Sequence, residues 1–455
     1  MIVKDLSDTN AVGIDGLSLR FVRDSLPVMV FYYTVIVNTS IVTGKYPELW
    51  KHPLIAPVHK SGDFEEVGNY RPIALLPILS KILEKVISSQ LMEHLEKNSL
   101  LSNSQHGFRP KLSTETALLK VTDATYDNID KNLITLIMLC DLSKAFDSVS
   151  HEILLNKLGL VQVDDFWFKS YLDGRKQSVQ IDNTVSSSCS VEYGVPQGSI
   201  LGPILFLIYV NDMIQMGLDC LLVQYADDCQ FILKDKLENL NDMIRKAENI
   251  LVKAKQYFDM NGLLINPRKT QVIFIGSRHN IAGIPNNITI SFDGNSITPS
   301  LNVKNLGICI DRYMTFDIHI DNSHKKVMGI LMYLNRIKDS LPYSTRLLVI
   351  QALVSSVINY CSKIWGAASK CNLQKIQKLQ NFAARIALGN VRKRDHISPH
   401  LKKLEWLRIE NKYIFDICVL MFKILNPGAV AWANRRATTR VVPYMLRALS
   451  APTGF

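Results

Sequence analysis

The sequence lacks the features that mark several classes of protein. Its eight cysteines include no C-x-x-C pair and no spacing with histidine that suits zinc, which argues against a zinc-binding module. Several cysteines stand in apolar runs, where we expect small buried side chains in a reducing environment. Internal repeats and low-complexity segments are also absent, which argues against a solenoid or a disordered chain.

Long apolar runs are missing as well. The strongly apolar stretch Leu26 to Val37 has twelve residues, too few to span a bilayer, and no basic segment followed by a cleavage site marks a signal peptide. We therefore expect a buried helix at this position. We expect no membrane partner and an intracellular protein, nuclear or cytoplasmic.

A net positive charge is confined to the C-terminal third of the chain. The net charge is +11, yet residues 323–413 carry 17 Lys and Arg against 4 Asp and Glu, and residues 1–322 are net negative. The basic region has helical periodicity, with cations interleaved among Leu, Ile and Phe. Such a helical surface suits the phosphates of a nucleic acid, although a solvated helix face would look the same. The cations concerned are Lys325, Lys326, Arg336, Lys338, Lys375, Lys378 and Arg385.

A Y-A-D-D tetrad, Tyr225 to Asp228, lies between two apolar runs and predicts a tight bend between buried strands. Two adjacent carboxylates at such a bend are costly unless a cation is present. Another apolar run, 133–140, ends on Asp141 and delivers a third carboxylate at a strand end. The pattern predicts a site for two Mg²⁺ ions that serves phosphoryl transfer, and the same oxygen ligands accept Mn²⁺.

Further blocks accompany these aspartates in a fixed order. They are W-K-H-P-L-I-A-P-V-H-K-S-G-D with N-Y-R-P-I-A-L-L-P-I-L-S-K-I-L-E (50–84), Q-H-G-F-R (105–109), D-L-S-K-A-F-D (141–147), G-V-P-Q-G-S-I-L-G-P (194–203), N-P-R-K-T (266–270) and Leu306-Gly307. In this order the chain resembles the reverse transcriptases of non-LTR retrotransposons of the LINE type, jockey/CR1-like. The resemblance covers roughly residues 10–310 and implies an RNA-directed DNA polymerase.

The resemblance also implies a fold. We expect an α+β right-hand polymerase whose palm is an antiparallel sheet backed by helices. Residues 1–125 would be mostly helical fingers with a nucleotide-clamp hairpin, 126–318 the palm, and 319–427 a basic helical thumb with its extension. The tail 428–455 departs from the family pattern and is expected to be disordered or truncated. Nothing ahead of residues 13–17 could hold a nicking endonuclease, so the chain is expected to be the polymerase part of an element.

Several residues can be assigned roles at the expected active site. Lys60 and Arg71 flank a turn, Ser61-Gly62-Asp63, so a hairpin would bring both cations to the triphosphate of a nucleotide; the alternative is two solvated charges. Phe146 would exclude a 2′ hydroxyl and select deoxynucleotides. The neighbouring Asp147 is expected to cap a helix that starts near Ser148.

The remaining roles follow from loops and from the resemblance. Gln197 and Gly198 stand in a loop that leads into a buried helix, where Gln197 would hydrogen-bond a template or nucleotide base, with Ser199 as helix cap. Tyr225 belongs to the same substrate-binding set by resemblance. Lys269 would protonate the leaving pyrophosphate. Leu306 and Gly307 resemble the hairpin that grips the primer.

The predicted function is therefore RNA-directed DNA synthesis, with template RNA, primer DNA and dNTPs as partners. An RNA-directed RNA polymerase is disfavoured by Phe146 and by Tyr-Ala in place of Gly before the aspartate pair. The alternative from another class is an RNA-binding retroelement remnant without catalysis. Nucleotide incorporation that depends on metal would separate that remnant from the polymerase.

Overall fold

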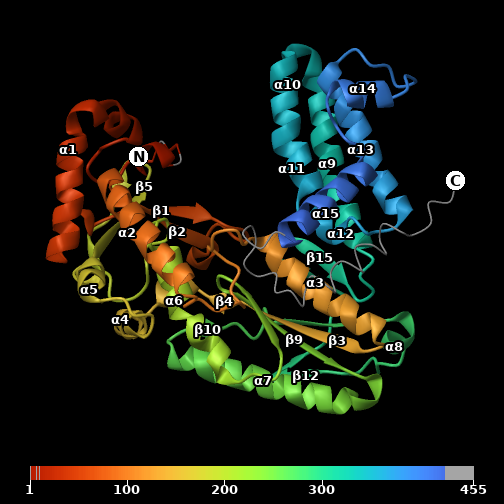
Figure 1. The fold of residues 1–455 in the computed structure, drawn as a ribbon, viewed down its shortest axis with the longest axis horizontal. Coiled ribbons are helices and arrows are strands. Elements are labelled where there is room, and N and C mark those ends of the chain that lie inside the picture. Colours follow the sequence, from red (N-terminus) through yellow and green to blue (C-terminus); the bar gives the residue numbers. More distant parts are fainter. Residues whose placement is uncertain (1, 7, 10, 426–455) are drawn as a thin grey trace.

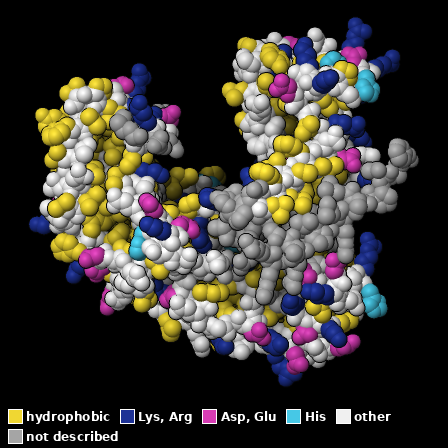
Figure 2. Space-filling view, viewed as in Figure 1, with side chains coloured by type: hydrophobic (Ala, Val, Ile, Leu, Met, Phe, Trp, Pro, Cys, Tyr) yellow, Lys and Arg dark blue, Asp and Glu magenta, His cyan; other side chains and the backbone are white. Residues whose placement is uncertain are grey.

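The computed structural model describes residues 2–6, 8–9 and 11–425; the tail predicted at 428–455 lies outside the described residues. Three parts are visible in Figure 1: an N-terminal lobe, a central sheet with its helices, and a C-terminal lobe of helices. The two lobes rise from the same side of the central part. Figure 2 shows the molecular surface hollowed between them.

The N-terminal lobe combines two long helices with a small sheet. Helices α1 (Leu19–Thr43) and α2 (Ile78–Lys97) pack beside the antiparallel hairpin of β1 (Leu54–His59) and β2 (Tyr70–Leu75). Strand β5 (Lys176–Ile181) pairs in parallel with β1, so a segment from the middle of the sequence completes this lobe. Two short strands extend the sheet from β5, namely β6 (Thr184–Val185) and β7 (Cys189–Ser190).

Helix α1 corrects the expectation of a buried helix at 26–37. Ser18 caps its start and Gly44, with φ 63°, ends it, but much of its apolar surface is open: Val28 is 75% exposed and Phe31 69%. The helix is apolar around most of its circumference and packs along only one stripe. By length and composition it is the one helix in the described part of the chain that could cross a membrane, which alone is weak evidence.

The central sheet has the strand order β11-β3-β9-β8 and is antiparallel throughout. Side chains of β3 alternate between two cores: Leu136 and Met138 face one, and Ile137 faces the other. Helix α3 belongs to the second core and helix α7 to the first, so they cover opposite faces of the sheet. The bounds are β3 (Ile134–Cys140), β8 (Leu221–Tyr225), β9 (Asp228–Asp235), β11 (Gln271–Ile275), α3 (Thr114–Asp130) and α7 (Leu240–Met260). The expected fingers–palm boundary at 125 falls within α3.

Shorter elements connect these parts. The helices are α4 (His151–Leu160), α5 (Phe166–Leu172), α6 (Gly202–Tyr209) and α8 (Arg278–Ala282). The strands form three small antiparallel pairs, β4 (Leu142–Ser143) with β10 (Leu264–Ile265), β12 (Ile290–Phe292) with β13 (Asn295–Ile297), and β14 (Asn302–Asn305) with β15 (Ile308–Asp311).

The C-terminal lobe is helical, as its periodicity predicted. Helices α9 and α13 pack against each other along their length, and the others surround them. The helices are α9 (Asp317–Ile337), α10 (Tyr343–Ile350), α11 (Ser356–Asn359), α12 (Ser362–Trp365), α13 (Lys370–Leu388), α14 (Ser398–Lys403) and α15 (Ile409–Leu425). With sheets in the first two parts and helices in the third, the mixed α+β class is confirmed.

Candidate active site

The Y-A-D-D tetrad forms the predicted tight turn between β8 and β9. Tyr225 pairs with Asp228 across the hairpin, and Ala226 takes a left-handed conformation with φ 56°. This conformation is unusual for a residue other than glycine, so surrounding contacts must hold the turn. The turn presents Asp227 and Asp228 at one end of the sheet.

Asp141 reaches the same end from the neighbouring strand. Cys140, the last residue of β3, pairs with Cys229 of β9, so Asp141 and Asp228 are adjacent just beyond this pair. Lys269 follows β10 and lies beside them, with its Nζ 3.3 Å from Oδ2 of Asp141. The structure thus brings the three predicted aspartates and Lys269 together.

The carboxylates perturb one another electrostatically. The pKa of Asp228 is raised to about 6, first because nearby protein atoms reduce its hydration and then by repulsion from Asp227 and Asp141. The pKa of Asp227 is also raised, by burial and by Asp141, while Lys60 and Arg71 act in the opposite direction. Added positive charge at this site would therefore be stabilising.

Lys60 and Arg71 come from the β1–β2 hairpin, as predicted. Arg71 pairs with Val58 in the ladder, and Lys60 N–H donates to the Asn69 carbonyl at 2.8 Å, closing the hairpin at its tip. Both side chains are exposed and lie near enough to the carboxylates to affect the Asp227 pKa. The β1–β2 hairpin, although distant in sequence from the aspartates, therefore places two cations near the end of the central sheet that bears them.

A cavity of 540 Å³ joins Lys60 to Asp141, Asp228 and Lys269. It extends from the carboxylates to the β14–β15 turn, where Leu306 and Gly307 have φ of 43° and 88°. Tyr360 of the C-terminal lobe holds this turn by donating to the Leu306 carbonyl at 2.6 Å. The residues lining the cavity include Lys60, Asp141, Asp228, Lys269, Lys304, Leu306 and Gly307.

The donor set suits a hard divalent cation, because carboxylate oxygens are the ligands that Mg²⁺ and Mn²⁺ prefer. In residues 2–6, 8–9 and 11–425 no three His, Cys, Asp or Glu side chains stand in a closed metal-binding group. One reason is that Asp141 is turned to the Lys269 ammonium. A cation would have to compete with this ion pair and gather the carboxylates as it binds.

Phe146 lies five residues after Asp141, in a short 3₁₀ helix, Ala145–Ser148. Its ring stacks on Phe206 with centroids 4.7 Å apart and meets Phe108 edge to face at 6.2 Å. The ring is only partly buried, so it retains a surface towards solvent. Two aromatic neighbours fix the position of this surface.

Asp147 does not cap a helix, contrary to the expectation. Helix α4 starts later, at His151, and Ser150 is its cap. The Asp147 carboxylate instead accepts two hydrogen bonds from Nε2 of Gln197, at 2.8 and 3.0 Å, while burial raises its pKa. Gln197 is thereby oriented by the protein itself.

The loop that carries Gln197 lies across β2. Ala74 N–H donates to the Gln197 carbonyl at 2.7 Å, and a Cβ on Gly198, whose φ is 111°, would lie 3.0 Å from the Ala74 carbonyl oxygen. Only glycine allows this close approach. The Ser199 hydroxyl accepts from Gly202 N–H at 2.9 Å at the start of α6, but the N-cap residue of this helix is Leu201 and not the expected Ser199.

Tyr225 is half-buried and packs against the second core cluster, together with Leu306. Its position at the end of β8 is as predicted. A separate correction concerns Arg385, which was counted among the surface cations. Its guanidinium donates to the backbone carbonyls of Asn381, Arg392, Lys393 and Asp395 and so organises a loop.

Two buried residues, which lie in the sequence blocks 50–84 and 105–109, have structural roles at the site that these blocks did not reveal. Gln105 holds the turn: its Oε1 accepts from Ala226 N–H at 3.0 Å and from Gly107 N–H at 2.8 Å, and its Nε2 donates to the Ala226 carbonyl at 3.3 Å. Glu84 holds the start of α6, accepting from the N–H groups of Ile200 and Leu201 at 2.7 and 3.3 Å. Burial raises the pKa of Glu84, and Arg175 opposes this rise.

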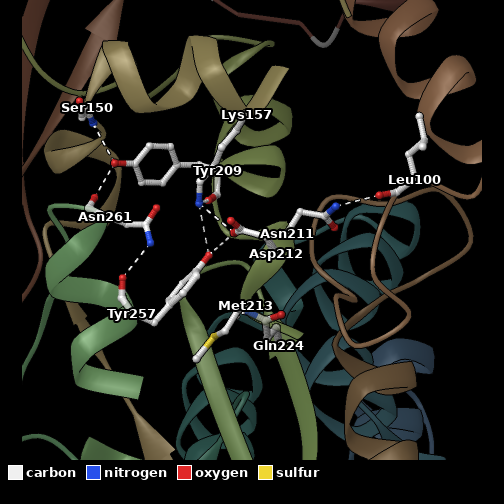
Figure 3. Close-up of polar contacts among 10 residues, drawn as sticks. All are labelled: Leu100, Ser150, Lys157, Tyr209, Asn211, Asp212, Met213, Gln224, Tyr257 and Asn261. Atoms are coloured by element: carbon white, nitrogen blue, oxygen red, sulfur yellow. Dashed lines mark hydrogen bonds and ion pairs between the residues drawn. The ribbon is translucent and has the colours of Figure 1, made fainter. Parts of the chain in front are cut away.

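A polar network behind the turn supports the Gln105 segment (Figure 3). Asn211 accepts from Ser102 N–H at 2.8 Å and donates to the Leu100 carbonyl at 2.7 Å, which anchors the loop leading to Gln105. The adjacent Asp212 accepts from Lys157, at 2.8 Å, and from Tyr257. The ammonium of Lys157 is thus buried but paired, as a buried charge must be.

Several known proteins are similar in sequence to this chain. Residues 58–310 match the family described as reverse transcriptase (RNA-dependent DNA polymerase). The chain is 28% identical over 399 residues to a probable RNA-directed DNA polymerase from transposon BS of Drosophila melanogaster, covering 84% of this chain and 43% of that protein. It is 27% identical over 393 residues to the RNA-directed DNA polymerase from mobile element jockey of the same species, with coverages of 83% and 42%.

A solved structure is also similar, that of telomerase from Candida albicans in complex with a TWJ fragment of telomeric RNA. The TM-score is 0.43 and the identity 13%, over 80% of this chain and 68% of that chain. The chain spans less than half the length of the curated relatives named above.

Proposed function

Because this chain belongs to the reverse transcriptase (RNA-dependent DNA polymerase) family, we propose that it is the polymerase of a non-LTR retrotransposon. It extends a primer 3′ end with dNTPs along an RNA template. Template RNA, primer DNA and dNTPs are its partners, no membrane is involved, and it acts inside the cell, in the nucleus or cytoplasm.

One observation carries this proposal: Asp141 and Asp228, on two neighbouring strand ends, share a cavity with Lys60 from a distant hairpin, and the adjacent Asp227 is influenced by Lys60 and Arg71 of that hairpin. This is a charge pattern that a nucleoside triphosphate and its metal ions would complete. A structural ion pair would not need three carboxylates at one end of a sheet, two of which, Asp227 and Asp228, have a pKa raised by burial and then by repulsion from neighbouring carboxylates.

We assign the parts of the right hand to the three parts of the fold. The N-terminal lobe forms the fingers and the central sheet the palm, with the β5 segment reaching from the palm region into the fingers. The C-terminal lobe forms the thumb. Primer and template lie in the hollow between the two lobes (Figure 2), and the Leu306-Gly307 turn faces the primer.

The acidic site would hold Mg²⁺, or Mn²⁺, through Asp141, Asp227 and Asp228. Two such ions, when bound, activate the 3′ hydroxyl and stabilise the leaving pyrophosphate. Lys60 and Arg71 bind the triphosphate and orient its α-phosphorus towards the primer. When Asp141 binds a metal ion, its ion pair with Lys269 would be broken. The Lys269 ammonium would then be free to donate a proton to the leaving pyrophosphate.

We assign selection of the nucleotide to Phe146 and to the loop of Gln197 and Gly198. Phe146, fixed between Phe206 and Phe108, lies against the sugar and leaves no room for a 2′ hydroxyl. Gln197 and Gly198 contact the base or template through a loop that Asp147 orients. Tyr225 supports the turn and borders the nucleotide site.

The test is primer extension on poly-rA/oligo-dT with Mg²⁺, supplied in parallel with dTTP or UTP. The purified chain is compared with Asp227→Asn and with Asp219→Asn, which removes one exposed carboxylate just before β8 as a matched control. We expect dTTP incorporation by the wild type and the control, loss in Asp227→Asn, and little use of UTP.

Other outcomes select the alternatives. Efficient use of UTP would favour an RNA-directed RNA polymerase. A folded wild-type chain that binds RNA but incorporates neither nucleotide would favour a non-catalytic RNA-binding remnant.

A further inference from the structure

A cluster of cations stands at the end of the C-terminal lobe, outside the candidate active site. Figure 2 shows Lys, Arg and His side chains gathered where Figure 1 places α14, at the end of the lobe remote from the central sheet. All six cations of this cluster are exposed. We call them the basic tip: Arg392, Lys393, Arg394, Lys402, Lys403 and Arg408.

The basic tip is a concentrated and unneutralised charge. Within the span 392–408 only Asp395 and Glu405 are acidic. None of its six cations takes part in a salt bridge among the residues that the structure describes, whereas Lys375 on the neighbouring α13 pairs with Asp321 at 2.6 Å. Repulsion among unpaired cations disfavours such a cluster unless a polyanion approaches it.

The loop that carries three of these cations is held in a defined shape. Arg385 donates to the carbonyls of Arg392, Lys393 and Asp395, at 3.3 to 3.4 Å. The Asp395 carboxylate accepts from Arg392 N–H at 2.7 Å, so the one acidic side chain in the loop is used for its backbone. The loop is therefore preorganised with its cationic side chains directed outwards, which lowers the entropy cost of binding.

Helices α10 and α11, rather than α14, border the hollow between the lobes (Figure 1). A primer–template duplex held in that hollow would therefore not cover the basic tip. The polymerase proposed above must hold a long RNA, of which only a short part occupies the active site at any time. RNA outside the hollow is a polyanion available to the tip for as long as synthesis proceeds.

We infer that the basic tip is a second RNA-binding surface, which binds the phosphate backbone of the template beyond the catalytic hollow. This inference rests on the proposed function, since that function supplies the RNA. Lysine and arginine side chains that contact phosphates recognise the charge of the backbone and not the base sequence. Binding at the basic tip is therefore independent of sequence and weakens as the salt concentration rises. The surface retains the template on the enzyme during synthesis.

The test compares two complexes of the purified chain by fluorescence anisotropy. One is a short blunt primer–template and the other is the same duplex with a long single-stranded RNA extension. The variant is Arg392→Gln/Lys393→Gln/Arg394→Gln. Its control, Lys97→Gln/Lys236→Gln/Lys246→Gln, removes three exposed lysines elsewhere and changes the net charge equally.

We expect the triple variant to bind the extended RNA roughly 10-fold more weakly and to reduce the salt slope by about 2. Its binding of the blunt duplex and its incorporation rate on a short template should not change, nor should its unfolding midpoint. The pair variant Lys402→Gln/Lys403→Gln should show a smaller effect in the same direction.

Three outcomes would overturn the inference: equal weakening on both complexes, no weakening on either, or an effect that appears only when the extension is DNA. The proposed function fails separately, through absence of nucleotide incorporation by the wild type while RNA binding persists.

Discussion

Replacing Gln105 should impair catalysis, although the Gln105 side chain holds the turn of the aspartates and does not itself contact the substrate. Its carboxamide is 2% exposed and satisfies both backbone groups of Ala226, the left-handed residue of the turn. Gln105→Ala removes three hydrogen bonds and leaves the Ala226 N–H and carbonyl buried without a partner. The aspartates that follow would then be free to shift.

The magnitude follows from these contacts. A net hydrogen bond contributes about 1 kcal/mol, and a buried group left unsatisfied costs about 1–3 kcal/mol. We therefore expect a loss of about 2–4 kcal/mol in the free energy of unfolding. A displacement of the carboxylates by a fraction of an ångström to one ångström should lower kcat by up to about 100-fold.

The assay is single-turnover incorporation of dTTP alongside urea unfolding. Asn280→Ala is the matched control, because Asn280 is buried, donates twice to Asn132 at 3.1 Å and lies at the opposite end of β3 from the aspartates. It should lose stability without losing incorporation by the folded protein. If Gln105→Ala incorporates dTTP as fast as Asn280→Ala at equal stability, the positioning role is refuted.

Four further outcomes are expected. Burial lowers the pKa of His106 from 6.5 to about 3, so between these pH values the unfolded chain binds a proton that the native chain does not. The free energy of unfolding is therefore highest above pH 6.5 and should fall by about 1.4 kcal/mol per pH unit as the pH drops towards 3. Urea unfolding should show this slope, and His106→Gln should remove it. Phe146→Ala should raise UTP use relative to dTTP by about 10-fold or more in primer extension. An unchanged ratio of UTP to dTTP use would show that the ring does not contact the sugar. Lys269→Ala should slow incorporation about 100-fold with unchanged primer–template affinity; equal rates would exclude the acid role. Glu84→Ala leaves the N–H groups of Ile200 and Leu201 without their acceptor and should lower the free energy of unfolding in urea by about 2–4 kcal/mol, more than Glu84→Gln, which keeps an acceptor oxygen.

The acidic site could be predicted because its signal is local. Each aspartate interrupts or ends an apolar run, and a strand that stops at a carboxylate places that group at the edge of a sheet. The hairpin of Lys60 and Arg71 is local in the same sense, since a short segment, 60–69, which begins with the turn residues Ser61, Gly62 and Asp63, joins its two strands.

What could not be predicted depends on distant partners. Gln105 and Ala226 are 121 residues apart, and Glu84 and Ile200 are 116 residues apart, so neither contact has a sequence period or spacing. The surface of α1 was misjudged because an apolar helix does not reveal which of its faces has a neighbour. Asp147 was misassigned because Ser150 offers a better cap three residues later.

The central claim, that Asp141, Asp227 and Asp228 hold the metal ions of phosphoryl transfer, can be tested by counting ions. Mn²⁺ binding to the chain in complex with primer–template and a non-hydrolysable dNTP can be followed by electron paramagnetic resonance. We expect two tightly bound ions per chain, a loss of at least one in Asp228→Asn, and no change in Asp219→Asn. An equal count in Asp228→Asn and the wild type would contradict this claim.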